Sequence, residues 1–102
     1  MRLVVFFDVP METAAQQKSY RIFRKFLIKD GYQMMQKSVY SKMVTDGQAA
    51  QSAIARLRKN KPKYGLVQVL RVKEAQFAAI EDIAGEALAS DLVATMERLV
   101  VL

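Results

Sequence analysis

The sequence predicts an α+β fold in which the elements follow the order strand, helix, strand, strand, helix, strand. Apolar runs rich in β-branched or aromatic residues indicate strands at 3–7, within 32–44 and at 66–72. The two intervening segments repeat apolar residues at helical spacing, and each follows a Thr-x-x-Gln pattern typical of helix N-termini. The 102 residues have the usual size of one domain, so we expect a single domain spanning 1–102.

The first strand is predicted from the run Leu3 to Phe7, which ends on Asp8 and is closed by Pro10. A continuous apolar run of this kind is typical of a strand buried on both faces. An aspartate at the end of a strand often only caps a turn through the neighbouring backbone. Asp8 alone is therefore a weak functional signal.

The first helix is predicted to begin after Thr13 and to run to about Asp30, where Gly31 stops it. Its inner face is expected to contain five apolar residues: Ala15, Ile22, Phe23, Phe26 and Leu27. Its outer face is expected to contain a stripe of cations with Arg24 at the flank: Lys18, Arg21, Lys25 and Lys29. An ordinary solvated face is the alternative, although such a face usually mixes both charge signs.

From Tyr32 to Val44 the apolar alternation changes phase near Gln36, which predicts two strands or one bulged strand. A second helix is expected to start at Thr45-Asp46-Gly47-Gln48, with Ala50, Ala53, Ile54 and Leu57 inside. Five cations surround its end: Arg56, Arg58, Lys59, Lys61 and Lys63. Compensation of the helix dipole accounts for only one or two of them, and Pro62 and Gly65 predict an exposed loop here.

After the strand at 66–72, we expect a short helix from Glu74 to about Ile83, packed through Phe77 and Ile80. Residues 85–94 are ambiguous, and 99–102 read as an apolar terminal strand. This order is the ferredoxin-like plan, with a short helix and a C-terminal strand appended. RNA-recognition domains share the plan, but their aromatic signature is absent from this sequence. Small-molecule regulatory dimers share it too, without needing a basic excess.

The composition removes several chemistries, because the chain has no cysteine, histidine or tryptophan. Thiol nucleophiles, histidine-dependent triads and Cys/His zinc sites are excluded within one chain. Any catalysis would use carboxylates, hydroxyls, lysine or arginine, and we expect it to involve a hard cation bound by oxygen. The opening apolar run is too short to span a membrane, so we expect a soluble cytoplasmic protein.

The net charge of +6 is unevenly distributed along the chain. Residues 1–73 contain 15 Lys/Arg and 4 Asp/Glu, a net charge of +11. Residues 74–102 contain 1 Lys/Arg and 6 Asp/Glu, a net charge of −5. A basic body indicates a polyanionic partner, most often nucleic acid, with an anionic membrane surface as the weaker alternative. The acidic end indicates a basic partner or an intrachain counterweight.

Four segments together resemble CRISPR-associated protein 2, the small adaptation protein of CRISPR systems: "FFDVP", "SYRIFRKFLIKDGY", "MMQKSVYSK" and "ERLVVL". The resemblance covers nearly the whole chain in order and looks closest to forms that accompany type II systems. It implies a ferredoxin-like homodimer between two dimers of the CRISPR integrase. The resemblance further implies that this assembly helps to capture a short double-stranded DNA for insertion into the repeat array.

The resemblance also implies a metal site, because several family members are described as metal-dependent endonucleases acting on RNA or DNA. Their metal-binding aspartate ends the first strand, which is Asp8 here, and their "SVY" segment corresponds to residues 38–40. One carboxylate cannot satisfy Mg²⁺, which takes about six oxygen ligands. In a twofold dimer, two Asp8 side chains with waters and a phosphate oxygen would make a plausible site.

The leading hypothesis is a scaffold whose cations bind the phosphate backbone without reading sequence. The candidate nucleic-acid residues are Lys18, Arg21, Arg24, Lys25, Arg56, Arg58, Lys59, Lys61 and Lys63. The candidate integrase-contacting residues are Glu97, Arg98, Leu99, Val100, Val101 and Leu102. The alternatives are a Mg²⁺-dependent endonuclease with Asp8 as its catalytic and metal-binding residue, and a toxin-like ribonuclease of the virulence-associated group.

Overall fold

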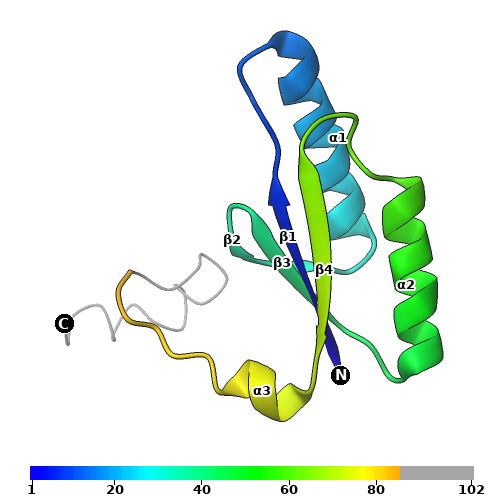
Figure 1. The fold of residues 1–102 in the computed structure, drawn as a ribbon, viewed down its shortest axis with the longest axis vertical. Helices are drawn as coiled ribbons and strands as arrows, with labels where there is room; N and C mark the ends of the chain where they lie inside the picture. The colour runs from blue at the N-terminus through cyan, green and yellow to red at the C-terminus, as the bar shows by residue number, and fades with distance from the viewer. Residues whose placement is uncertain (86–102) are drawn as a thin grey trace.

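The computed structural model describes residues 1–85 of the chain. The elements are, in order, β1 (Arg2–Asp8), α1 (Ala14–Lys29), β2 (Gln33–Gln36), β3 (Val39–Met43), α2 (Gly47–Lys59), β4 (Leu66–Val72) and α3 (Glu74–Ala78) (Figure 1). The predicted α+β order is confirmed. The predicted terminal strand at 99–102 lies outside the described residues. No helix within residues 1–85 is long and apolar enough to cross a membrane.

The four strands form one antiparallel sheet in the order β2-β3-β1-β4. In the centre of this sheet, Val5 of β1 lies opposite Tyr40 of β3 and Val69 of β4. The core contains Leu3, Val5 and Phe7 from β1 together with buried residues of both α1 and α2. Both long helices therefore pack on the same face of the sheet, called here the helix face.

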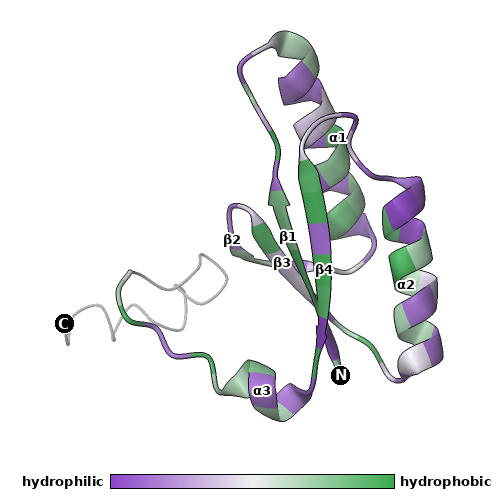
Figure 2. Ribbon diagram, viewed as in Figure 1, coloured by the Kyte–Doolittle hydropathy of each residue, from purple (hydrophilic) through white to green (hydrophobic). Residues whose placement is uncertain are grey.

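The opposite face, called here the open face, carries the alternate strand residues. Phe6 of β1 lies opposite Gln68 of β4, and the neighbouring β4 side chains of Leu66 and Leu70 are exposed. The prediction that β1 is buried on both faces holds on the open face at Val4, which is 7% exposed, and is wrong at Phe6, which is 38% exposed because α1 and α2 pack on the other face. Apart from the exposed Gln68, the exposed side chains of Phe6, Leu66 and Leu70 make this part of the open face apolar up to Asp8, and the ribbons of β1 and β4 are mainly green in Figure 2.

The helix starts agree with the sequence at α1 and differ at α2. At α1, the Thr13 hydroxyl accepts from the Gln16 backbone N–H and the Gln16 side chain accepts from the Thr13 N–H, both at 3.1 Å. At α2, the N-cap is Asp46, whose carboxylate accepts from the Ala49 N–H at 2.8 Å. The predicted cap at Thr45 is wrong by one residue, because aspartate is a stronger N-cap than threonine.

The buried stripe of α1 consists of Ser19, Phe23 and Leu27, which follow one another at intervals of four residues. Phe26 is half-buried at its flank, as predicted. Ile22 and Ala15 were expected inside, but both are exposed, Ile22 to 58%. The difference arises because the stripe that faces the sheet is narrower than the apolar pattern.

The remaining predictions concern shorter elements. The break near Gln36 is confirmed as two strands, with a register shift between Met34 and Gln36. The predicted helix at 74–83 is shorter, since α3 ends at Ala78 and Ile80 is exposed. Phe77 is half-buried beneath the Arg2 guanidinium, 4.2 Å from its ring centroid.

Tyr32 follows α1 and is 4% exposed, and its hydroxyl has no hydrogen-bond partner within residues 1–85. Burial, with the nearby Asp30 carboxylate adding to it, raises the pKa of Tyr32 to about 12. A raised tyrosine pKa means that the folded state binds the phenolic proton more tightly than the unfolded state. This difference adds to the free energy of unfolding, and the contribution is fully present below about pH 10, the usual pKa of a tyrosine. It is lost as the pH rises toward 12.

We therefore expect Tyr32→Phe to be neutral or stabilising at pH 7, because it removes a buried hydroxyl without a partner. Between pH 10 and 12, the wild type should lose roughly 2–3 kcal/mol of unfolding free energy that Tyr32→Phe does not lose. Urea unfolding at several alkaline pH values measures this difference. Tyr64→Phe, at an exposed tyrosine, is the control, and equal alkaline losses in all three proteins would contradict the prediction.

Candidate metal and nucleic-acid site

Asp8 is the last residue of β1 and its side chain lies on the open face, where Asp8 pairs with Leu66 at the start of β4. It borders a hollow of about 230 Å³. The hollow is lined by Phe6, Phe7, Asp8, Ser38, Val39, Leu66 and Gln68. The strand end therefore places an exposed carboxylate at the rim of an apolar surface.

The backbone around Asp8 is fixed from both neighbouring strands. The Phe7 N–H donates to the Ser38 carbonyl at 3.0 Å, which ties the start of β3 beside it. On the other side, Gly65 has φ +90° and approaches so closely that an added Cβ would clash with the Asp8 carbonyl oxygen. The sequence predicts only a loop at Gly65, and a glycine directly before a strand was the signal for this close approach.

Gly65→Ala is expected to strain the backbone and to displace Asp8, since both the positive φ and the space disfavour a side chain. We expect a loss of about 2 kcal/mol or more in the free energy of unfolding. Gly47→Ala is the matched control, because nothing lies within 4 Å of its added Cβ. Thermal or urea unfolding measures both, and a Gly65→Ala protein as stable as Gly47→Ala would contradict the geometry.

The oxygen donors around this hollow are of the kind that Mg²⁺ prefers. They are the Asp8 carboxylate, the Ser38 hydroxyl and the Gln68 side-chain amide, all hard ligands. Within residues 1–85, no group of three or more His, Cys, Asp or Glu side chains is placed to hold a metal ion. One chain thus supplies a single carboxylate at this hollow, which is too few protein ligands for a complete Mg²⁺ site. These residues fit a site to which a second chain also contributes ligands.

The segment at 38–40 is divided between the two faces of the sheet. Ser38 and Val39 line the hollow beside Asp8, whereas Tyr40 is fully buried on the helix face. The Tyr40 ring stacks on Phe7 with centroids 5.6 Å apart, and its hydroxyl accepts from Arg24 Nε at 3.1 Å. Tyr40 therefore belongs to the core and orients Arg24 of α1.

The cations of α1 and of the loop after α2 come together in space. The buried Ser19 hydroxyl of α1 accepts from the Lys63 backbone N–H at 3.1 Å, which docks the loop against the helix. Beside this contact, a hollow of about 450 Å³ lies between α1 and the loop, with Lys18, Lys61 and Lys63 in its lining. Sequence patterns did not identify Ser19, although a serine aligned with Phe23 and Leu27 was the available signal.

Arg56 is already paired within the chain. Its Nε lies 2.9 Å from Asp30 Oδ1 and 3.2 Å from Oδ2, and Lys42 Nζ lies 3.5 Å from the same carboxylate. Within residues 1–85, the one further ion pair joins Arg2 to Glu74 at 2.8 Å. The other candidate phosphate-binding cations have no acidic partner in this part of the chain.

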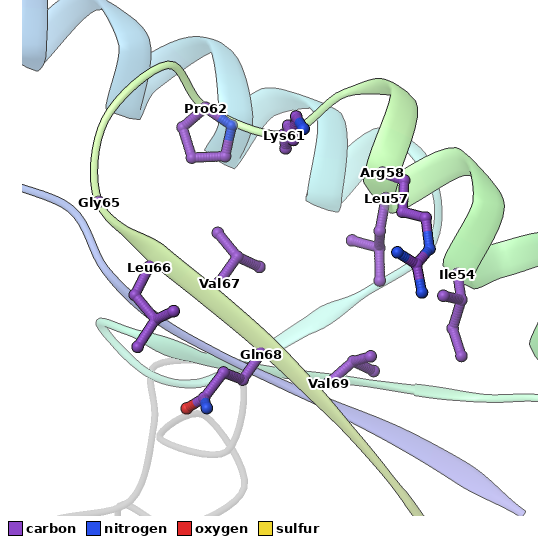
Figure 3. Close-up of a pocket in the computed structure, with 10 residues that line it drawn as sticks. All are labelled: Ile54, Leu57, Arg58, Lys61, Pro62, Gly65, Leu66, Val67, Gln68 and Val69. Carbon is purple, nitrogen blue, oxygen red and sulfur yellow. The ribbon is translucent and has the colours of Figure 1, made fainter.

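The cations near the end of α2 face more than one direction. Arg58 and Lys61 line a hollow of about 380 Å³ between α2 and β4. Figure 3 shows Val67 and Val69 pointing toward α2, whereas Leu66 and Gln68 point to the opposite side of the strand. This hollow therefore lies on the helix face, apart from the Asp8 hollow. Lys59, also exposed, ends the helix.

The family model for CRISPR associated protein Cas2 matches residues 1–80, which include every helix and strand described above. The chain belongs to the Cas2 family. The CRISPR-associated endoribonuclease Cas2 of Treponema denticola is 49% identical over 102 residues, and both chains are covered completely. That of Streptococcus mutans strain UA159 is 46% identical over 86 residues, covering 84% of this chain and 79% of the relative.

A crystal structure of Streptococcus pyogenes Cas2 at pH 6.5 is similar to this fold, with a TM-score of 0.64 and 25% sequence identity. The match covers 82% of this chain and all of the Streptococcus pyogenes chain. The Cas2 resemblance carried by the four sequence segments is thus confirmed, and the ferredoxin-like order of β1 to β4 agrees with it.

Proposed function

We propose that this chain acts in CRISPR adaptation as a homodimer that bridges two integrase dimers and binds the phosphate backbone of a short DNA duplex. The observation that carries the proposal is a basic surface of a Cas2-family chain whose α1 cations have no acidic partner within residues 1–85. Lys18, Arg21 and Lys25 of α1 are exposed, and the ion pairs of residues 1–85 leave all three without an acidic partner. Such a surface suits a polyanion recognised by charge.

Duplex binding should therefore depend steeply on salt. Each phosphate contact contributes a slope of about −0.9 in a plot of log affinity against log salt concentration. Replacing Arg21 and Lys25 together with glutamine should make the slope shallower by about 2 units. Lys37→Gln, in the turn between β2 and β3, is the control with a change of charge at another site. Affinity of the wild type that barely changes with salt would exclude the proposal.

The homodimer is proposed to form through the open face. Its exposed Phe6, Leu66 and Leu70 make an apolar surface that a second copy of the same face would cover. An isologous contact near the end of β1 would bring Asp8 close to Asp8 of the partner subunit. These two carboxylates would then hold Mg²⁺, which when bound supplies the charge stabilisation that phosphodiester hydrolysis requires.

A second candidate function is a Mg²⁺-dependent endonuclease acting on RNA or DNA. It is favoured by the oxygen donors beside Asp8 and by the relatives' designation as endoribonucleases. Asp8→Asn should abolish metal-dependent cleavage while the fold and the dimer persist. Glu12→Gln removes an equal charge from an exposed position and should keep full activity. Unchanged cleavage by Asp8→Asn would remove Asp8 from the catalytic role.

We also propose that residues 97–102 contact the integrase by adding a strand to a sheet edge. The proposal rests on the apolar run at 99–102 and on strand addition as a common mode of recognition. A chain lacking residues 97–102 should lose integrase binding in a pull-down while keeping the dimer mass. Full binding by the truncated dimer would contradict it.

A further inference from the structure

The loop after α2 approaches α1 (Figure 1), and two neighbouring hollows along this side of the helix form a groove. It consists of two hollows of about 450 and 420 Å³ that share Asn60 in their linings. The first lies between Ile22 of α1 and the loop at 60–64, and the second continues past Phe26 toward Asp30. This feature is called here the α1 groove.

The α1 groove is lined by five lysines: Lys18, Lys25, Lys29, Lys61 and Lys63. The acid in its lining is Asp30, which is already bound by Arg56 and Lys42. From Lys18 to Lys29 the helix rises about 16 Å, so the cations extend well beyond the reach of one phosphate group. The charge therefore favours an extended polyanion lying along the helix.

The groove also exposes apolar and aromatic side chains between these cations. Tyr64 is 39% exposed and Ile22 58%, and both line the first hollow together with Pro62. A duplex backbone bound by charge alone needs no such surface. Proteins that bind single strands combine a basic groove with aromatic side chains on which unpaired bases stack.

The size of the hollows supports the same ligand. Volumes of 420–450 Å³ fall within the range of roughly 300–1,000 Å³ that is usual for small-molecule sites, enough for a base with its sugar. A double helix is too wide for them and keeps its bases stacked inside. Resting on the proposed nucleic-acid function, we propose that the α1 groove binds a single strand, with an unpaired base stacked on Tyr64 and phosphates on the flanking lysines.

The wall that carries Tyr64 is held in place by the fold. Ser19 binds the Lys63 backbone, and the Asn60 side chain donates to the Arg56 carbonyl at 2.9 Å. Pro62 further restricts the backbone of the same loop. A preformed wall reduces the ordering that binding would otherwise require.

Fluorescence anisotropy with labelled oligonucleotides of about 12 nucleotides tests the proposal, since single-strand sites span roughly 4–16 nucleotides. The probes are oligo-dT, oligo-U and a DNA duplex of equal length. Tyr64→Ala should weaken binding of the single strands at least about fivefold and change duplex affinity less than twofold. Tyr64→Phe, which keeps the ring, should bind as the wild type does. Ile83→Ala, at an 89% exposed position outside the groove, is the matched control.

The DNA and RNA arms show which strand the groove prefers, and stronger binding of either one supports the proposal. No binding of either single strand by the wild type, or equal effects of Tyr64→Ala on single strands and duplex, would overturn it. Single-strand affinity unaffected by Tyr64→Ala would overturn it too. The duplex arm reports separately on the proposed scaffold function, because salt-sensitive duplex binding can persist when the groove proposal fails.

Discussion

Leu70→Asp is expected to convert the proposed homodimer into monomers. Leu70 is 52% exposed on the open face, in the edge strand β4, where it lies opposite Val4 of β1. A carboxylate there would have to lose its water at an apolar contact without a partner. We expect the dissociation constant of the dimer to rise at least about 100-fold, which corresponds to roughly 3 kcal/mol.

Light scattering coupled to size exclusion measures this change as a fall from about twice the 11.6 kDa chain mass to that mass. Ile83→Asp introduces the same charge at an exposed position away from the sheet and should leave the dimer intact. A Leu70→Asp protein that dimerises as tightly as Ile83→Asp would place the interface elsewhere.

Phe23→Ala is expected to have the largest effect on stability. The side chain is 1% exposed, and its ring meets Phe7 edge-on with centroids 5.2 Å apart. Removing a buried phenyl ring costs about 3–5 kcal/mol, a large part of the 5–15 kcal/mol typical of whole domains. Urea unfolding should show this loss as a lower midpoint.

The neighbouring residue provides the control for Phe23. Ile22→Ala removes an apolar side chain that is mostly exposed and should cost less than about 1 kcal/mol. Similar losses at both positions would contradict the orientation of α1 in the structure. Comparing the two variants also tests whether only the buried stripe of α1 packs on the sheet or whether the wider apolar face predicted from the sequence does.

Much of the fold was predictable because local signals agreed with it. The Thr13 capping box, the apolar run of β1 and the phase break near Gln36 each depend on residues close together in the chain. The exposure of Phe6 was not predictable in this way. It depends on α1 and α2 packing on one face of the sheet, which a run of apolar residues does not specify.

The residues of the candidate site could be predicted from the sequence, but their positions relative to one another could not. Asp8 could be identified through the family resemblance, whereas the contact between Asp8 and Gly65 depends on how β1 meets β4. The cations of α1 and of the loop after α2 are more than thirty residues apart in the chain. They meet because α1 and α2 pack on the same face of the sheet and the Ser19 hydroxyl binds the Lys63 backbone, whereas Arg56 is held in an ion pair with Asp30.

The most direct test of the proposed function is spacer integration in vitro by the cognate integrase, measured with and without this chain. Integration should require the chain, persist with Asp8→Asn and fall when Arg21 and Lys25 are both replaced by glutamine. Integration that proceeds equally well without the chain would contradict the scaffold function. Loss of integration in a folded, dimeric Asp8→Asn protein would contradict it as well and would assign the essential role to the carboxylate.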